Sequence, residues 1–459
     1  MRTGSHKSPK QRNPSDFSAH PGRVSGFALA AGRLSSRVQS QCNKSPNEQS
    51  RVSKQVVVIG GGVMGSALAY WLTRLDPVSR VTVVERDPSY AHASSALSAA
   101  SIRQQFSTAV NVRISQASIA FLRKAADELG SGDGARPNIG LREAGYLYLA
   151  GAGADVGAAG AGAGAGVEAG PASDTQLRRT HGVQKSCGAD VVLLSPAELG
   201  KRFSWLNTSD LSLGSLGLSG EGWFDGYTLL TAFARKAREQ GARYVNGDAS
   251  SFTIEGNRIT DVILADGSHI GCTHVINAAG PWARHIAALA GVELPVSARR
   301  RTVYVISCPT PMSPFPLLID PTGFWIRPEG TKYIAGFSPA DDRDDQPLQP
   351  DYAAFENELW PALAHRIPAF EQARLERAWA GYFEMNTFDH NAILGPHPAL
   401  ENFLFMNGFS GHGIQQAPIV GRAIAELVLH GRFVSLDLSE LLFSRITENR
   451  PLREANVIG

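Results

Sequence analysis

The sequence predicts an α/β fold with room for two domains, and three observations lead to this prediction. A β-branched run, Val56–Ile59, precedes a glycine-rich turn and an apolar helix. A second expected strand, Phe403–Met406, also leads through glycines into a helix, far along the chain. The chain of 459 residues, 43% of them hydrophobic and 19% charged, has the composition of a globular protein and the length for two domains.

The first of these segments carries a glycine pattern with a physical purpose. Gly60, Gly62 and Gly65 fit the spacing G-x-G-x-x-G directly after the strand, and a second strand over Val81–Val84 ends on Glu85. Glycines in this turn let the backbone approach a pyrophosphate at a helix N-terminus, and the acid can accept a hydrogen bond from a ribose hydroxyl. Strand, turn, helix, strand and acid in this order predict a dinucleotide site of the Rossmann type.

The neighbours of this pattern complete the predicted cofactor contacts. Val63 and Met64 stand between the second and third glycines, where the helix begins. Arg86 directly follows the acid. An acid at the end of the second strand favours FAD or NAD over NADP.

The composition argues against several function classes. The formal net charge of +2 gives no reason to expect a nucleic-acid partner. No run of about 18 apolar residues occurs, so no membrane span is expected. The cysteines lack CxxC or ligand-like spacing, which suits free thiols in a reducing compartment and argues against a disulfide framework or a metal site. They are Cys42, Cys187, Cys272 and Cys308.

Residues 1–53 differ in composition from the rest of the chain. Over the first 54 residues, six arginines and four lysines stand against Asp16 and Glu48, and residues 23–38 could form a basic amphipathic helix. This composition is typical of a mitochondrial transit peptide, and a disordered extension or a spurious upstream start is the alternative. We therefore expect the protein in the mitochondrial matrix or on the matrix side of the inner membrane, with the cytoplasm as the alternative.

A second irregular segment follows a predicted strand at Tyr146–Ala150. Residues 151–170 consist mainly of glycine and alanine, which cannot build a packed face. We expect a flexible surface insertion without a catalytic role over residues 151–190. Residues 441–459 are expected to form a C-terminal tail.

The elements between these segments follow in a regular order. A turn at Asp225–Gly226 precedes a helix that Gly241 ends. Short strands with intervening turns are expected over Ser251–Ile270. Val275–Ile276 then leads into the small residues of Asn277–Trp282, where the backbone could approach a cofactor closely.

The second glycine loop, Gly408–Gly413, precedes a helix predicted from about Gln415 to His430. A glycine loop at a helix N-terminus again suits an anion. Two such features far apart in sequence predict one cofactor bound along its whole length.

Together these motifs resemble the D-amino-acid oxidase-like family of FAD-dependent oxidoreductases, which includes enzymes that oxidise sarcosine and dimethylglycine. The resemblance rests on the first glycine pattern, Ser94–Ser95, GWFDGYTLLTAF, VINAAGPWA and GFSGHGIQQAP. Within the family, the chain is most similar to a mitochondrial member that serves as an assembly factor for respiratory complex I. That similarity lies in ALSAASIRQQFS, WAGYFEMNTFDHNAILGPHP and the run from Gly408 to Phe433.

The resemblance implies a two-domain flavoprotein. A Rossmann-like FAD-binding domain would be assembled from residues 54–140, 215–296 and 380–440. The substrate domain, an α+β unit whose antiparallel sheet roofs the flavin, would come from residues 141–214 and 297–379. The isoalloxazine would lie between the domains. In such enzymes a hydride leaves the carbon beside an amine nitrogen for flavin N5, and the product imine then hydrolyses.

The family pattern also implies which residues contact FAD. Backbone N–H groups around Gly413–Ile414 would stabilise charge near flavin N1 and C2=O. Ala249 matches a position at which relatives touch adenine through the backbone, or it only packs. The remaining expected cofactor residues are Ser94, Ser95, Ala279, Gly280, Trp282, Gly408, Gly411 and His412.

Five side chains are candidates for the chemistry itself. Arg103 and Arg327 could each anchor a substrate carboxylate, or could be structural arginines. Tyr382 and Glu384 stand in the segment that lines the flavin in sarcosine oxidases. His412 is expected at the flavin edge, or bound to backbone.

Several positions depart from the family pattern. Relatives attach FAD covalently through a histidine, here replaced by Ser98, or a cysteine, here replaced by Tyr382 or Phe383, so non-covalent FAD is expected. Residues 414–416 replace a lysine that holds the substrate carboxylate in sarcosine oxidases, which weakens the case for an amino-acid substrate. The run Arg299–Arg301 is expected to form a solvated face.

Two functions remain open at this point. The first is an enzyme that oxidises a small secondary amine or N-methyl amino acid and passes electrons to oxygen, a flavoprotein or quinone. The second is a flavin-bearing assembly factor that binds complex I subunits or assembly intermediates, with peripheral contact to the inner membrane. A bacterial or cytosolic amine oxidase is a further alternative.

Overall fold

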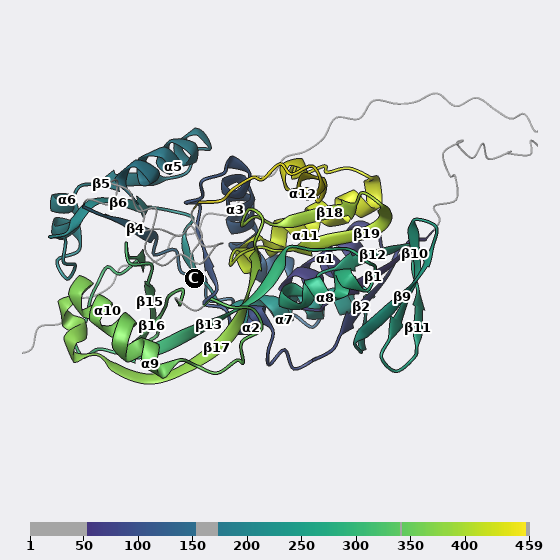
Figure 1. Ribbon diagram of the computed structural model, residues 1–459, viewed down its shortest axis with the longest axis horizontal. Helices are drawn as coiled ribbons and strands as arrows, with labels where there is room; N and C mark the ends of the chain where they lie inside the picture. The colour runs from purple at the N-terminus through teal and green to yellow at the C-terminus, as the bar shows by residue number, and fades with distance from the viewer. Residues whose placement is uncertain (1–52, 153–172, 340–341, 456–459) are drawn as a thin grey trace, which may run out of the picture. The chain divides into compact units, whose positions relative to one another are not determined.

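The computed structural model describes residues 53–152, 173–339 and 342–455. The expected transit segment over residues 1–53 therefore lies outside the described residues except for its last position, as do residues 153–172 of the expected insertion. Two large sheets, one of six strands and one of eight, organise the described part (Figure 1).

The six-stranded sheet contains the first predicted strand pair. Its order is β18-β19-β12-β1-β2-β8, and every neighbouring pair is parallel except β18 with β19. Parallel strands covered on both faces need apolar, β-branched side chains, which is the composition of β1. The strands are β1 (Gln55–Ile59), β2 (Arg80–Glu85), β8 (Arg243–Asn246), β12 (His274–Asn277), β18 (Ile393–His397) and β19 (Leu400–Asn407).

Helices cover one face of this sheet. They are α1 (Val63–Leu75), α3 (Ala109–Leu122), α7 (Gly226–Glu239) and α11 (Gly413–His430). Trp71 of α1 donates its indole N–H to the Pro418 carbonyl of α11 at 2.7 Å. A Cβ at Gly421 would lie 2.9 Å from the backbone carbonyl carbon of Ala67, so glycine lets α11 pack closely on α1. This packing joins the two predicted glycine loops in space.

A smaller sheet and a short helix cover the opposite face. The smaller sheet has the order β11-β10-β9 and packs its apolar side chains against those of β1 and β12. These elements are β9 (Ala249–Glu255), β10 (Arg258–Leu264), β11 (His269–Gly271) and α8 (Ala283–Ala288).

The eight-stranded sheet has the order β17-β13-β16-β15-β14-β4-β6-β5. It is antiparallel apart from the parallel pair of β14 with β4. Its strands are β4 (Tyr146–Gly151), β5 (Val191–Leu194), β6 (Leu211–Gly217), β13 (Val296–Ser307), β14 (Leu317–Ile319), β15 (Trp325–Glu329), β16 (Lys332–Gly336) and β17 (Arg374–Asn386).

Side chains alternate between the two faces of this sheet, as the pleat of a β-strand requires. Leu147 and Leu149 of β4 belong to a core that includes residues of α6 (Pro196–Arg202) and α10 (Trp360–Arg366). Tyr146 and Tyr148 belong instead to an apolar cluster with Trp325 on the other face. The second face supplies the wall of the cavity described below.

Short elements complete the fold. They are α2 (Ser94–Leu97), β3 (Ser101–Ile102), α4 (Ala125–Glu128), α5 (Asp174–Ser186), α6 (Pro196–Arg202), β7 (Gly222–Trp223), η1 (Gly280–Trp282), α9 (Tyr352–Ala354), η2 (Phe355–Leu359), α10 (Trp360–Arg366), η3 (Pro368–Gln372), η4 (Ser439–Leu441) and α12 (Ser444–Thr447). Among the described residues, no helix is long and apolar enough to cross a membrane.

Part of the expected flexible insertion is ordered. Residues 174–186 form α5, so the prediction of a flexible segment over 151–190 is wrong from Asp174 onward. The Ser173 side chain caps this helix by accepting a hydrogen bond from the Gln176 N–H, and Leu177 and Thr180 are buried. The glycine- and alanine-rich composition does not extend into this amphipathic stretch.

The sheet also shifts two expected domain limits. Residues 380–386 belong to β17 and residues 215–217 to β6, whereas the predicted limits place both in the FAD-binding domain. Both strands run past the predicted limits because their ladders with β13 and β4 continue without interruption there. The rest of the predicted division stays a prediction.

The expected C-terminal tail is packed where it is described. Glu454 is 2% exposed, and its carboxylate accepts hydrogen bonds from the N–H groups of Ser107 and Thr108. The segment is therefore held against the start of α3.

The prediction of a solvated face at residues 299–301 is wrong. These arginines lie on β13, and each pairs with an aspartate of the segment 342–351. The ion pairs are Arg299–Asp344, Arg300–Asp351 and Arg301–Asp342. The paired residues are about 40 to 50 positions apart in the sequence, so composition alone could not reveal that the acidic segment folds back onto this strand.

Candidate cofactor and substrate cavity

A cavity of about 980 Å³ lies between the two large sheets. Its wall combines the carboxyl ends of β1 and β2, helix α2, the loop before α11, and side chains of β4, β13, β15 and β17. Ligands of open α/β sheets bind at the carboxyl ends of the strands. The cavity thus begins where the sequence predicts the cofactor and extends to the second sheet.

The glycines of the first pattern have different tasks. Gly60 has φ of +100°, and a Cβ there would lie 2.4 Å from the Ala278 carbonyl oxygen. Gly60 and Gly62 line the cavity. Gly65 is not among the lining residues, and a Cβ there would lie 1.9 Å from the Gly60 carbonyl oxygen. Its task is to let α1 pack against β1, as the third glycine of this pattern commonly does.

The carboxylate of Glu85 stands at the end of β2 and lines the cavity. Oε2 accepts a hydrogen bond from the Gly61 N–H at 2.7 Å, and Oε1 accepts one from the Asp87 N–H at 2.8 Å. These bonds orient the carboxylate and leave lone pairs for a ligand hydroxyl. Ala249, at the start of β9, lines the same region.

A stack of side chains borders the cavity next to this carboxylate. The guanidinium carbon of Arg86 lies 3.8 Å from the ring centre of Trp282, and Trp282 meets Tyr382 edge to face at 5.9 Å. All three residues line the cavity together with Ala279 and Gly280. The predicted residue after β2 and those of η1 and β17 are thus brought together.

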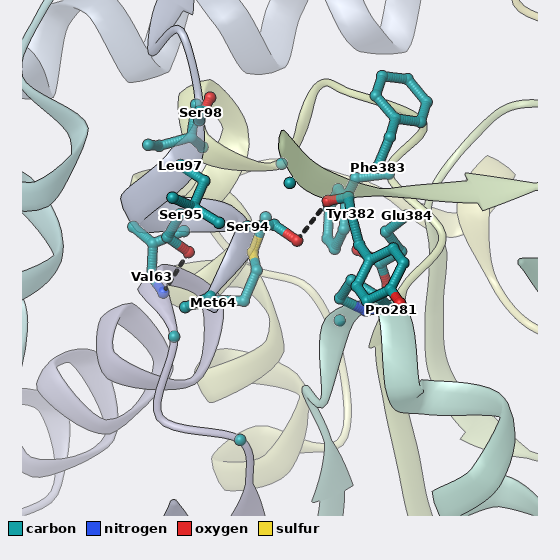
Figure 2. Close-up of a pocket in the computed structure, with 18 of the residues that line it drawn as sticks. Val63, Met64, Ser94, Ser95, Leu97, Ser98, Pro281, Tyr382, Phe383 and Glu384 are labelled. Atoms are coloured by element: carbon teal, nitrogen blue, oxygen red, sulfur yellow. Dashed lines mark hydrogen bonds between the residues drawn. The ribbon is translucent and has the colours of Figure 1, made fainter. Parts of the chain in front are cut away.

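Helix α2 connects the first glycine pattern to the second sheet. Ser95 Oγ accepts a hydrogen bond from the Val63 N–H at 3.1 Å, and Ser94 Oγ donates one to the Tyr382 carbonyl at 2.6 Å (Figure 2). Met64 lies beside these groups on the cavity wall (Figure 2). The paired serines therefore fix the position of α2 between the two halves of the protein.

The second glycine loop brings the N-terminus of α11 to the cavity. Gly411, Gly413 and Ile414 line it, whereas Gly408 does not. Gly408 has φ of +69° and holds the turn that leaves β19. The uncompensated N–H groups at the start of α11 favour negative charge in this part of the cavity.

Glu384 of β17 is a half-buried acid on the cavity wall, as is visible beside Tyr382 in Figure 2. Its Oε1 accepts a hydrogen bond from the Gly408 N–H at 2.6 Å. Burial raises the pKa of this carboxyl to about 7, against the opposing effect of that bond. Glu384 can therefore hold or release a proton near neutral pH.

Arg103 and His412 also lie together on the cavity wall. Nη2 of Arg103 is 2.9 Å from Nε2 of His412, and Nη1 donates to the Gln105 carbonyl at 2.9 Å. Burial, together with the charge of Arg103, holds the pKa of His412 well below its usual range. The guanidinium of Arg103 is thus already engaged with protein groups.

Arg327, the second expected anchor, is not among the lining residues. It donates to the Ala99 carbonyl at 2.6 Å and to the Pro328 carbonyl at 2.9 Å, and it pairs with Glu329. The structure therefore gives Arg327 the role of a buried arginine that ties β15 to the segment after α2.

Sequence reasoning expected a sheet over the flavin but missed most of the residues that the eight-stranded sheet contributes to the wall. These residues are Tyr146, Arg301, Val303, Leu317 and Trp325. They lie on β4, β13, β14 and β15, and no local motif marks them as cavity residues. Strand alternation could have paired Tyr146 with Tyr148, but it could not show which face meets the cofactor.

The donor set of the cavity fits FAD. Two helix N-termini, a ribose-type carboxylate and glycines that admit close backbone approach stand along one continuous wall. Ser98, Tyr382 and Phe383, which replace the residues of covalent attachment, also line it. Non-covalent attachment stays a prediction.

Comparison with known proteins agrees with this arrangement. Residues 55–427 match the family model described as FAD dependent oxidoreductase. The chain is 41% identical to FAD-dependent oxidoreductase domain-containing protein 1 of Xenopus laevis, over 88% of this chain and 84% of the relative. It is 25% identical to the mitochondrial dimethylglycine dehydrogenase of Homo sapiens, over 88% of this chain and 46% of that protein.

Solved structures show the same fold. The L-proline dehydrogenase from P. horikoshii superposes with a TM-score of 0.73 at 26% identity, covering 87% of this chain and 99% of that one. The glycine oxidase from Geobacillus kaustophilus gives a TM-score of 0.70 at 22% identity, covering 86% and 99%. The predicted α/β fold with a second sheet domain and the predicted FAD are confirmed by these findings. The chain belongs to the D-amino-acid oxidase-like family of FAD-dependent oxidoreductases.

Proposed function

We propose that this FAD-dependent oxidoreductase oxidises the carbon–nitrogen bond of a small amine in mitochondria, where the protein also takes part in the assembly of respiratory complex I. One observation carries the catalytic part. The cavity continues past the N-terminus of α11 to a wall of sheet side chains that includes Tyr146 and Trp325. This wall leaves a place for a small molecule beside the redox-active end of the cofactor.

The residues on this wall have separate tasks in the proposed reaction. FAD, when bound, supplies the acceptor for the hydride that leaves the carbon beside the amine nitrogen. The N-terminus of α11 favours the negative charge that accumulates at that end of the cavity. Glu384 can take a proton near neutral pH, and Tyr146, whose pKa burial raises to about 12, stays a neutral hydrogen-bonding group.

The test of the catalytic part is anaerobic bleaching of the flavin absorption in the purified protein. The compounds are sarcosine, dimethylglycine, proline, and D- and L-amino acids. Rapid bleaching by one of them supports the proposal and names the substrate class. A chain that holds FAD but is reduced by no compound would shift the function to assembly alone.

The assembly part rests on sequence. Segments 96–107, 379–398 and 408–433 resemble the mitochondrial member that serves complex I, and residues 1–53 have the composition of a transit peptide. Cells that lack the protein should lose assembled complex I and regain it with the wild-type chain. Rescue by a variant that cannot hold FAD would separate the assembly role from the flavin.

A dedicated metabolic enzyme is the second candidate. The similarity to dimethylglycine dehydrogenase favours an N-methyl amine as its substrate. Normal complex I in cells without the protein, together with fast bleaching by such an amine, would select this alternative.

A further inference from the structure

A line of buried polar groups leads from Glu221, just before β7, to the cavity wall. Glu221 is 0% exposed, and its carboxylate accepts hydrogen bonds from the Gln104 N–H at 2.6 Å and from Gln105 Nε2 at 2.9 Å. The Gln105 carbonyl in turn accepts from Arg103 Nη1, and Arg103 Nη2 meets His412 Nε2. Glu221 thus fixes the backbone that carries Arg103.

The contact between Arg103 and His412 determines where the imidazole carries its proton. A guanidinium has five N–H donors and no acceptor. At 2.9 Å from Arg103 Nη2, Nε2 of His412 must therefore present its lone pair. A neutral ring with its lone pair on Nε2 carries its proton on Nδ1.

The other ring nitrogen is left for a ligand. Within residues 53–152, 173–339 and 342–455, no hydrogen-bond acceptor contacts Nδ1 of His412, although the ring lines the cavity. Phe106 meets the ring edge to face at 4.8 Å on another side. The charged or titratable groups packed around the Arg103–His412 pair are Tyr146, Tyr148, Glu221 and His390.

We propose that Arg103 is a positioning residue that fixes His412 as a neutral imidazole, so that Nδ1–H is a permanent hydrogen-bond donor to the ligand at the redox end of the cavity. In this role Arg103 does not anchor a substrate carboxylate. The inference rests on the proposed function for the identity of that ligand, whereas the tautomer follows from the protein alone.

A neutral imidazole N–H suits the position beside Arg103 better than a charged imidazolium would. A second positive charge beside Arg103, in surroundings where both side chains are at most 3% exposed, would be costly. A neutral N–H can still stabilise negative charge that develops on the ligand. It does so at every pH at which Arg103 is charged, which includes the whole range from pH 5.5 to 8.5. The hydrogen-bonding strength of the site is thereby independent of pH.

The test is two-bond proton–nitrogen NMR of the histidine-labelled, FAD-loaded protein between pH 5.5 and 8.5, with His412 assigned through His412→Gln. We expect His412 to carry its proton on Nδ1 throughout and to show no titration. Arg103→Met should introduce a titration within this range, because the donor and the neighbouring charge are both removed. Arg103→Gln should restore the Nδ1–H tautomer, because an amide N–H can donate to Nε2.

Two controls keep the inference falsifiable. Arg258→Met removes an exposed arginine of β10 and should leave the His412 signals unchanged. A wild-type His412 that titrates within the range, or that carries its proton on Nε2, would overturn the inference even if Arg103→Met does not fold. Failure of the substrate panel to bleach the flavin, with the tautomer as expected, would contradict the proposed function and leave this inference standing.

Discussion

The two ends of the cavity are built in different ways. At the β1–β2 end, Gly60, Gly62 and the carboxylate of Glu85 line the wall, and a Cβ at Gly60 would lie 2.4 Å from the Ala278 carbonyl oxygen. At the other end, side chains such as Tyr146 and Trp325 line the wall, and they come from different strands of the eight-stranded sheet. The first end is suited to hold a constant group, the dinucleotide, and the second can change its chemistry by single substitutions.

The largest effect is expected at the β1–β2 end of the cavity. In Gly65→Val, the new Cβ would meet the Gly60 carbonyl oxygen, 1.9 Å from its ideal position, so α1 must move away from β1. We expect protein purified without FAD, measured as loss of the visible flavin absorption. Gly132→Ala is the matched control, because a Cβ there meets nothing within 4 Å. Retention of FAD by Gly65→Val would contradict the view that backbone packing forms this end.

A smaller effect on the same end is expected from Glu85→Ala. Hydrogen bonds to a charged group contribute about 2 kcal/mol, so the FAD dissociation constant should rise roughly 30-fold. Isothermal titration of the flavin-free chain with FAD measures this change. The exposed Glu255→Ala should leave the affinity as it is, and an unchanged affinity in Glu85→Ala would show that the acid contacts no ligand.

At the end formed by the eight-stranded sheet, a substitution should change the rate of flavin reduction and leave FAD affinity nearly unchanged. Tyr146→Phe removes a hydroxyl that bonds to Ser101 Oγ on the cavity wall. We expect FAD affinity to stay within about twofold and the rate of anaerobic flavin reduction to fall about tenfold, which corresponds to one lost hydrogen bond. Stopped-flow absorption with the best substrate of the panel gives this rate. A large loss of FAD affinity would erase the distinction between the two ends.

The buried acids give the smallest expected effect, a dependence of stability on pH. Burial raises the pKa of Glu221 to about 7 from an ordinary value of 4.5. Because its folded-state pKa is higher than that of the unfolded chain, its contribution to stability is present below pH 4.5 and is lost as pH rises toward 7. The melting temperature of Glu221→Gln, relative to that of the wild-type chain, should therefore be higher at pH 8 than at pH 5. Equal shifts at the two pH values would contradict the raised pKa.

The difference between the two ends of the cavity, one built on a local motif and the other on distant segments, explains what the sequence could and could not predict. The strand, turn and helix at residues 56–72 are local, and their glycines and Glu85 were identifiable because each task requires one residue type at one spacing. The pairing of Arg301 with Asp342 and the place of Trp325 depend on contacts between distant segments. For Arg327 the sequence left an anchor and a structural arginine as alternatives, since nothing in its local sequence shows that it contacts Ala99 and Glu329.

Helix α5 teaches a related lesson about composition. The glycine- and alanine-rich run ends near residue 170, but Ser173 already supplies an N-cap and Leu177 an apolar side chain for burial. A helix can therefore form directly after a low-complexity segment, because an N-cap and one apolar face are enough to stabilise it.

The central claim is that this cavity holds one non-covalent FAD. The most direct test precipitates the purified full-length chain with acid and measures the flavin that is released. We predict one equivalent of FAD per chain in the supernatant and no flavin in the precipitate. Flavin retained in the precipitate would contradict non-covalent binding. A chain that carries no flavin and takes up none on titration would contradict the assignment of the cavity itself.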